Sequence, residues 1–61
     1  MPNPKYRVGD HVLFVFDDEE INGTIVEVNF FTDPICYDVR DDNTKAHYKN
    51  VPETVFINLI S

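Results

Sequence analysis

The chain has little cysteine, little glycine and no long apolar run, and each shortage excludes a class of protein. Cys36 is the only cysteine among 61 residues, so the monomer can form neither an internal disulfide nor a cysteine-based structural zinc site. The two glycines provide no glycine-rich phosphate loop. No segment resembles a signal peptide or could span a bilayer, and a free cysteine fits a reducing compartment, so we expect a cytoplasmic protein.

Basic residues are also scarce. Five Lys and Arg residues stand against eleven Asp and Glu residues, which gives a formal net charge of −6. An acidic surface is repelled by nucleic-acid phosphates and by anionic lipid, so direct nucleic-acid binding is disfavoured and no membrane contact is expected. The simplest interpretation of this charge is solubility.

The residues that could support catalysis are few. His11, His47 and Cys36 have no recognisable nucleophile context, and their spacing matches no metal site. Each of the three also fits a place on a predicted strand. We therefore expect no enzymatic activity, no metal and no cofactor.

What the chain does contain is a series of short β-strand patterns separated by turn signals. Val12, Phe14 and Phe16 alternate along the first strand, and its other face is also largely apolar, which suggests either a strand partly covered on both sides or an apolar face covered by a partner. In the second strand Gly23 indicates a bulge or bend, and the spacing of Ile25 and Val28 requires a further bulge or strong coiling. The patterns predict strands at 11–16, 21–31, 35–40, 45–49 and 55–60, with one helical turn over 51–54.

Five short strands with a helical turn before the last predict an all-β, partly open barrel with an up-and-down meander. Residues 1–6 are expected to form an extended arm, and residues 7–61 a single domain. The chain resembles the SH3-like barrels, in particular their Tudor-like and KOW-like branches. The resemblance is carried by Val8-Gly9-Asp10-x-Val12, Gly23-Thr24-Ile25, Tyr37-x-Val39-x-Asp41-Asp42 and Val51-Pro52.

The resemblance implies the fold more than the function, because such barrels serve protein binding, nucleic-acid binding and assembly alike. Tudor-like readers of methylated side chains carry aromatic residues just before the second strand, where this chain has Glu20 and Ile21. Phe16, Tyr37 and Tyr48 could supply rings, but they fit core positions more simply. KOW-like domains that bind RNA tend to be basic, whereas this chain is acidic.

In a meander, alternate turns lie at the same end of the domain, so the first and third turns are expected to form one acidic end. Its candidate partner-binding residues are Asp17, Asp18, Glu19, Glu20, Asp41 and Asp42. Three interpretations remain open: a solvated loop cluster, a docking surface for a basic partner or nucleic-acid mimicry, and a calcium site. The calcium site has the least support, because the spaced Asp-x-Asp-x-Asp-Gly pattern is missing.

The opposite end is expected to be aromatic. Phe30 and Phe31 are adjacent strand residues that point to opposite faces, so one should enter the core and the other should be at least partly exposed. With Pro34 they form the candidate surface for self-association or for a protein partner, and the alternative is local packing of the rings on Pro34 or Ile35.

These patterns together predict a non-enzymatic protein-interaction or assembly module, of a size that fits a bacteriophage or bacterial accessory protein. Two alternatives are kept. One is an acidic inhibitor that mimics nucleic acid and occupies a basic protein. The other is a Tudor-like reader of methylated side chains.

Overall fold

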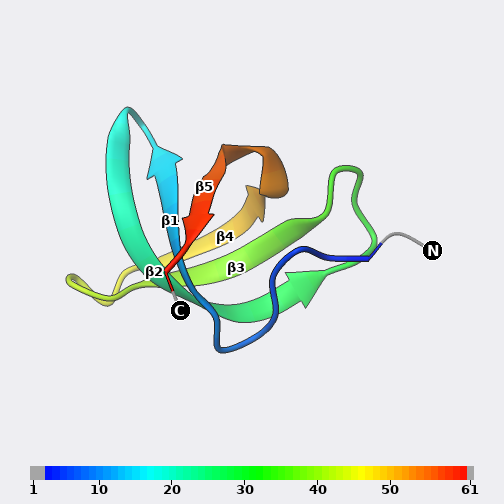
Figure 1. Cartoon of the computed structure of the whole chain (residues 1–61), viewed down its shortest axis with the longest axis horizontal. Helices are drawn as coiled ribbons and strands as arrows, with labels where there is room; N and C mark the ends of the chain where they lie inside the picture. The colour runs from blue at the N-terminus through cyan, green and yellow to red at the C-terminus, as the bar shows by residue number, and fades with distance from the viewer. Residues whose placement is uncertain (1–2, 61) are drawn as a thin grey trace.

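Five antiparallel strands form one strongly curved sheet in the computed structural model, which describes residues 3–60 (Figure 1). The strand order is β4-β3-β2-β1-β5. A single turn of 3-10 helix, η1, precedes the last strand. The elements are β1 (His11–Phe16), β2 (Glu19–Asn29), β3 (Cys36–Asp41), β4 (His47–Pro52), η1 (Glu53–Val55) and β5 (Phe56–Leu59).

The all-β class, the five strands and the helical turn before the last strand are confirmed. Strands β1 to β4 are consecutive neighbours, as the meander requires, and β5 pairs with β1. The sheet is not closed, because β4 and β5 form its two edges within residues 3–60. The predicted arm over 1–6 and domain over 7–61 include Met1, Pro2 and Ser61, which lie outside the described residues.

The turn between β1 and β2 is shorter than its four carboxylates suggested. Asp17 and Asp18 both have left-handed backbone conformations, with φ of 54° and 65°, which is the geometry of a two-residue hairpin turn that Asp tolerates. Glu19 and Glu20 therefore belong to β2, where they pair with Phe16 and Val15. The prediction of a four-residue loop was wrong for this reason.

Strand β2 contains one bulge, which lies between Ile25 and Glu27. The extra residue, Val26, restores the inward direction, so Ile25 is buried and Val28 packs against the core. Of the bulge or bend expected at Gly23, the bulge is absent, because this residue pairs regularly with both neighbouring strands. Its role is close approach: a Cβ there would lie 2.5 Å from Cγ1 of Val39 and 2.9 Å from the carbonyl oxygen of Arg40.

The core lies on the concave side of the sheet. Its buried apolar residues are Val12, Phe14, Ile21, Ile25, Ile35, Tyr37, Val39 and Val51. The Phe56 ring stacks on Phe14 and on Tyr6, with centroids 5.6 and 5.0 Å apart, and so closes the open side of the core.

The described part of the N-terminal arm is tied to this core. The backbone N–H of Lys5 donates to the Tyr37 hydroxyl at 3.1 Å, and the Tyr6 ring packs edge-on against Tyr37. Both contacts are made to the buried side chain of Tyr37 in β3. Residues 5 and 6 therefore complete the domain although they precede its first strand.

The turn after β3 is long and internally bonded. The Asp41 carboxylate accepts the backbone N–H groups of Asn43 and Thr44 at 2.7 and 3.2 Å. The backbone of Asp41 in turn exchanges hydrogen bonds with Lys45 and Ala46. This turn delays β4 to His47, so Val51 and Pro52 end the strand and the helical turn follows at 53–55 instead of 51–54.

Candidate functional site

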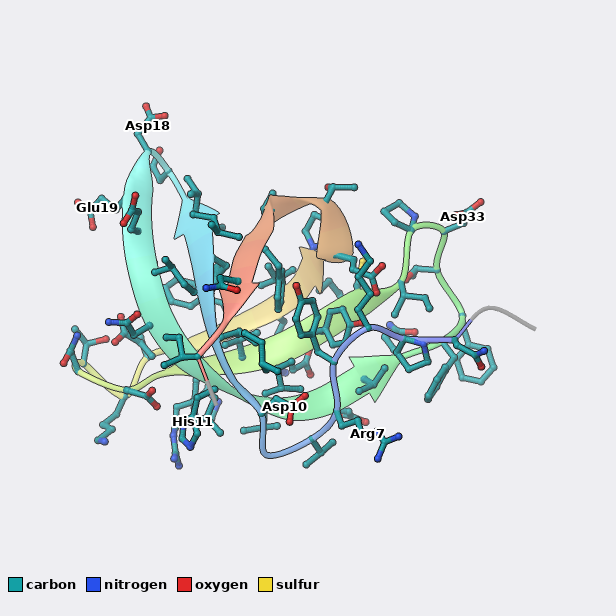
Figure 2. The ribbon with its side chains drawn as sticks, in the orientation of Figure 1. Arg7, Asp10, His11, Asp18, Glu19 and Asp33 are labelled. Carbon is teal, nitrogen blue, oxygen red and sulfur yellow. The ribbon has the colours of Figure 1, made fainter. Side chains whose placement is uncertain are left out.

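The six carboxylates of the expected acidic end do not form one cluster. Asp42 follows β3 in the sequence and lies beside the first residue of β1. Its Oδ2 is 3.6 Å from Nδ1 of His11. Asp18 follows the other end of the same strand, and Figure 2 shows Asp18 and His11 far apart. The meander is correct, but β2 extends beyond β3, because β3 is paired with β2 only from Gly23 onward. The β1–β2 hairpin therefore projects away from the β3–β4 turn (Figure 1).

Asp41 and Asp42 are engaged inside the domain. The backbone N–H groups of Asn43 and Thr44 lower the pKa of Asp41 below its ordinary value of 3.8, because they stabilise the ionised carboxylate. Asp42 accepts a hydrogen bond from the Thr24 hydroxyl at 2.7 Å. The hairpin carboxylates are different, because all four are exposed. They are Asp17, Asp18, Glu19 and Glu20.

At the aromatic end, neither phenylalanine enters the core. Phe30 is 53% exposed and Phe31 is 99% exposed, so the prediction that one of them would be buried was wrong. Strand β2 ends at Asn29, and both rings therefore belong to the turn that follows it, where strand alternation no longer applies. Pro34 in the same turn is also exposed, and the next residue, Ile35, returns to the core.

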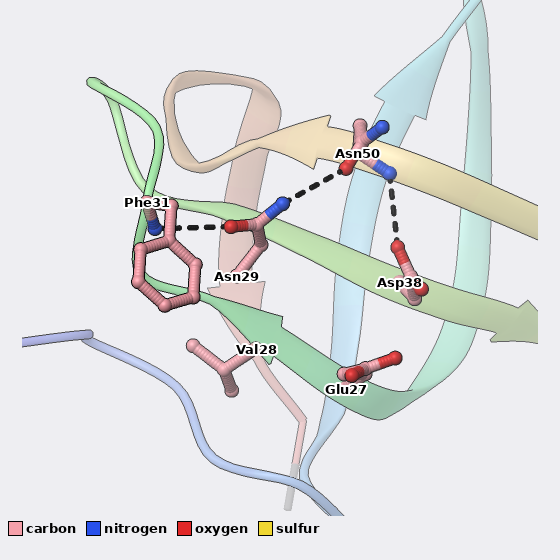
Figure 3. A pocket seen from close by; sticks show the side chains of 6 residues that line it. All are labelled: Glu27, Val28, Asn29, Phe31, Asp38 and Asn50. Carbon is pink, nitrogen blue, oxygen red and sulfur yellow. Dashed lines mark hydrogen bonds between the residues drawn. The ribbon is translucent and has the colours of Figure 1, made fainter.

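A groove of about 210 Å³ lies beside this turn, on the outer face of β2, β3 and β4 (Figure 3). It combines one aromatic ring, one aliphatic side chain, two carboxylates and two amides. The lining residues are Glu27, Val28, Asn29, Phe31, Asp38 and Asn50.

Hydrogen bonds fix the rim of this groove. Asn29 accepts the backbone N–H of Phe31 through Oδ1 at 3.0 Å, and its Nδ2 donates to Oδ1 of Asn50 at 3.3 Å. The Asn50 backbone N–H donates to Oδ1 of Asp38 at 3.0 Å (Figure 3). Asn50 has a φ of 55°, a left-handed conformation that Asn adopts more readily than most residues. The β2–β3 turn is thereby connected to β4.

Sequence reasoning identified Phe31 but missed the rest of this groove. Glu27, Asp38 and Asn50 come from three different strands, and they meet only because of bulges in both strand pairs. The apolar spacing near Ile25 predicted a bulge or strong coiling, of which the bulge is present. The bulge between Tyr37 and Val39, which places Asn50 beside Asp38, has no signal in the apolar pattern.

The remaining reactive groups do not converge. His11 and Cys36 lie on different strands at different ends of the β2–β3 ladder, since Thr24 beside His11 pairs with Arg40 while Cys36 pairs with Asn29. No group of three or more His, Cys, Asp or Glu side chains is arranged to hold a metal within residues 3–60. In the part of the chain that the structure describes, no helix has the length and apolar character needed to cross a membrane.

Tyr37 has the most strongly perturbed side chain of the core. Burial raises the pKa of its hydroxyl to about 12, and the neighbouring Glu53 carboxylate, which accepts its hydrogen bond, contributes to the increase. The hydroxyl therefore stays protonated across the physiological range. It acts as a structural donor to Glu53 and an acceptor from Lys5.

Comparison of the chain with protein-family models, with curated proteins and with solved structures finds no match in any of the three.

Proposed function

We propose that this chain is a non-enzymatic protein-interaction module of the SH3-like barrel type, which docks a protein partner through its aromatic end, defined as Phe30, Phe31 and Pro34. The carrying observation is the Phe31 side chain, which is 99% exposed although its backbone is held to Asn29. An exposed ring on a fixed backbone suits the role of an interface anchor, because burying it on binding removes much apolar surface from water and the backbone beneath it is already ordered.

The fold assignment within this proposal rests on three features. The curved five-stranded sheet, the strand order β4-β3-β2-β1-β5 and the 3-10 turn before β5 all match what the SH3-like resemblance implies. Because this architecture hosts many functions, it supports a binding domain without selecting the partner.

The decisive experiment compares the native chain with Phe31→Ser. We expect Phe31→Ser to abolish concentration-dependent self-association in sedimentation velocity, or the capture of a discrete partner from the native host. Its free energy of unfolding should change by less than about 0.5 kcal/mol, because the ring makes no core contact. Thr32→Ala, an exposed change in the same turn, serves as the matched control. Identical assembly and capture by native and Phe31→Ser protein would refute the proposal.

A second candidate, an acidic nucleic-acid mimic, is supported by the projecting β1–β2 hairpin. Its four exposed carboxylates make no ion pair within the described part of the chain. A basic nucleic-acid-binding protein should then be held and released as salt rises. Neutralising Asp17, Asp18, Glu19 and Glu20 together should abolish this binding, and salt-independent binding would argue against mimicry.

A reader of methylated side chains has less support. Tyr37 is fully buried, and the rings of Phe16 and Tyr48 pack on each other with centroids 4.9 Å apart. These rings therefore leave no open cage around a methylated cation. Equal binding of methylated and unmethylated peptides would eliminate this alternative.

A further inference from the structure

The groove beside Phe31 has an acidic wall that the domain itself leaves uncompensated. Glu27 and Asp38 are direct cross-strand partners, and like charges in that arrangement destabilise a sheet. Arg40 lies on β3 with Asp38, and Lys49 lies on β4, yet neither side chain comes within 4 Å of these two carboxylates. Within residues 3–60 the close approach of a basic side chain to a carboxylate is instead that of His11 Nδ1 to Asp42 Oδ2, at 3.6 Å. A bound cation would remove this repulsion.

The opposite wall of the groove is the Phe31 ring. This ring is exposed to water. The face of an aromatic ring attracts a cation through its quadrupole, and the attraction strengthens when carboxylates lie on the other side. An aromatic wall facing an acidic wall therefore favours a cation that also has an apolar stem.

The backbone that carries both walls of the groove is arranged before any ligand arrives. Asn29 holds the backbone of Phe31, and Asn50 holds a carboxylate oxygen of Asp38, so that both walls are connected through the contact between the two amides. Preorganisation of this kind lowers the entropic cost of binding. A volume of about 210 Å³ suits one side chain, because it is smaller than the roughly 300 to 1,000 Å³ typical of small-molecule sites.

We propose that this groove binds the guanidinium of an arginine side chain presented by the protein partner, an inference that rests on the proposed function. The planar guanidinium stacks on Phe31 while its N–H groups donate to Glu27 and Asp38. The ammonium of a lysine can contact either the ring or a carboxylate, but it neither stacks on the ring nor forms paired hydrogen bonds with a carboxylate. The net charge of −6 favours the approach of a basic segment of the partner.

The test is a ¹⁵N chemical-shift titration with an acetylated, amidated Gly-Gly-Arg-Gly-Gly peptide. Two matched peptides carry citrulline, which has the shape of arginine without its charge, or lysine. We expect shifts concentrated at Glu27, Asn29, Phe31, Asp38 and Asn50 with the arginine peptide. The lysine peptide should bind more weakly, and the citrulline peptide should cause no localised shifts. Equal binding of citrulline or lysine, or shifts centred on the β1–β2 hairpin, would overturn the inference.

Variants separate the two walls. Glu27→Gln combined with Asp38→Asn should weaken arginine binding roughly five- to ten-fold, while Asn at 38 keeps an acceptor for Asn50. Phe31→Leu keeps an apolar side chain, and it should weaken binding about two- to five-fold by removing the ring face. The control is Glu19→Gln combined with Asp18→Asn, which removes the same charge at the hairpin and should leave binding unchanged. An equal loss in the control would show a non-specific charge effect and reject the site.

The outcomes distinguish this inference from the proposed function. If the arginine peptide does not bind but Phe31→Ser still abolishes assembly or capture, the inference fails and the interaction module stands. If the arginine peptide binds as expected but Phe31→Ser leaves assembly and capture unchanged, the proposed docking function fails instead.

Discussion

The two turns that flank β3 differ in how they treat their side chains. The turn after β3 bonds its own polar groups, since Asp41 accepts two backbone N–H groups and is nearly fully buried. The turn before β3 leaves Phe30 and Phe31 in water, and the backbone N–H of Phe31 donates to Asn29. In so small a domain, where stability is about 3–9 kcal/mol, one turn contributes to stability while the other leaves its apolar surface free for contact.

The largest loss of stability is expected at the C-terminal end of β3, next to the turn in which Asp41 binds backbone N–H groups. Gly23 pairs with Asp41, and a Cβ at Gly23 would lie 2.9 Å from the backbone oxygen of Arg40, which cannot move cheaply. Gly23→Ala should therefore lower the free energy of unfolding by about 2–3 kcal/mol, as overpacking does in tightly packed interiors. Urea denaturation followed by circular dichroism measures this loss.

Asn22→Ala is the matched control for Gly23→Ala, because the neighbouring side chain is exposed. It should change the free energy of unfolding by less than about 0.5 kcal/mol. If Gly23→Ala is as stable as this control, the close approach of β2 to β3 does not limit the fold.

The next largest loss of stability is expected near the start of β3, just after the aromatic end. Tyr37→Phe removes the hydroxyl that bonds Glu53 and Lys5, and it should cost about 1–2 kcal/mol of unfolding free energy. It should also increase hydrogen exchange at Lys5 and Tyr6. Tyr48→Phe is the control, because the Tyr48 hydroxyl makes no hydrogen bond within residues 3–60. Equal stability of the two variants would contradict the structural role of the Tyr37 hydroxyl.

Alkaline titration gives an independent readout of the same hydroxyl. The pKa of Tyr37 is raised from 10.0 to about 12, so the folded state holds this proton more tightly than the unfolded state does. The associated stability is complete below pH 10 and is lost as the pH rises toward 12. Native protein should therefore lose its advantage over Tyr37→Phe across this interval.

The smallest of the three effects is expected at Asp41 itself. Asp41→Ala leaves the N–H groups of Asn43 and Thr44 without their acceptor, and it should lower the melting temperature at pH 7. Because the folded pKa of Asp41 lies below 3.8, its contribution is present above that pH and is lost as the pH falls further. The two proteins should therefore converge in strong acid.

Phe31→Ser sharpens the comparison of the two turns. It should leave the melting temperature unchanged at every pH, in contrast to Asp41→Ala. If both variants melt alike at pH 7, the two turns do not differ as described.

Most of the fold could be predicted from the sequence, because burial imposes a period of two. Val12 and Phe14, and likewise Tyr37 and Val39, alternate and are fully buried. The spacing of Ile25 and Val28 indicated a bulge or strong coiling, and a bulge is present. The element boundaries were less accessible, because they depend on backbone conformations such as the positive φ of Asp17 and Asp18.

The candidate site was harder to predict, because it depends on register and on strand length. The acidic end was inferred from the order of the turns, but the excess length of β2 separates Asp18 from Asp42. The groove needs the exact offset of β3 against β4, which places Asn50 against Asp38. Polar residues on the outer face of a sheet show no regular spacing in the sequence from which the register of β3 against β4 could be predicted.

The pairing of β5 with β1 has a consequence for how the chain folds. Strands β1 to β4 pair with their sequence neighbours, and such local contacts close small loops and form quickly. Val12 pairs with Leu59, which is synthesised much later. The edge of β1 that faces β5 therefore stays unpaired on the ribosome until nearly the whole domain has been synthesised. During that interval the apolar first strand is a site where two nascent chains could join, and the late arrival of β5 ends this risk.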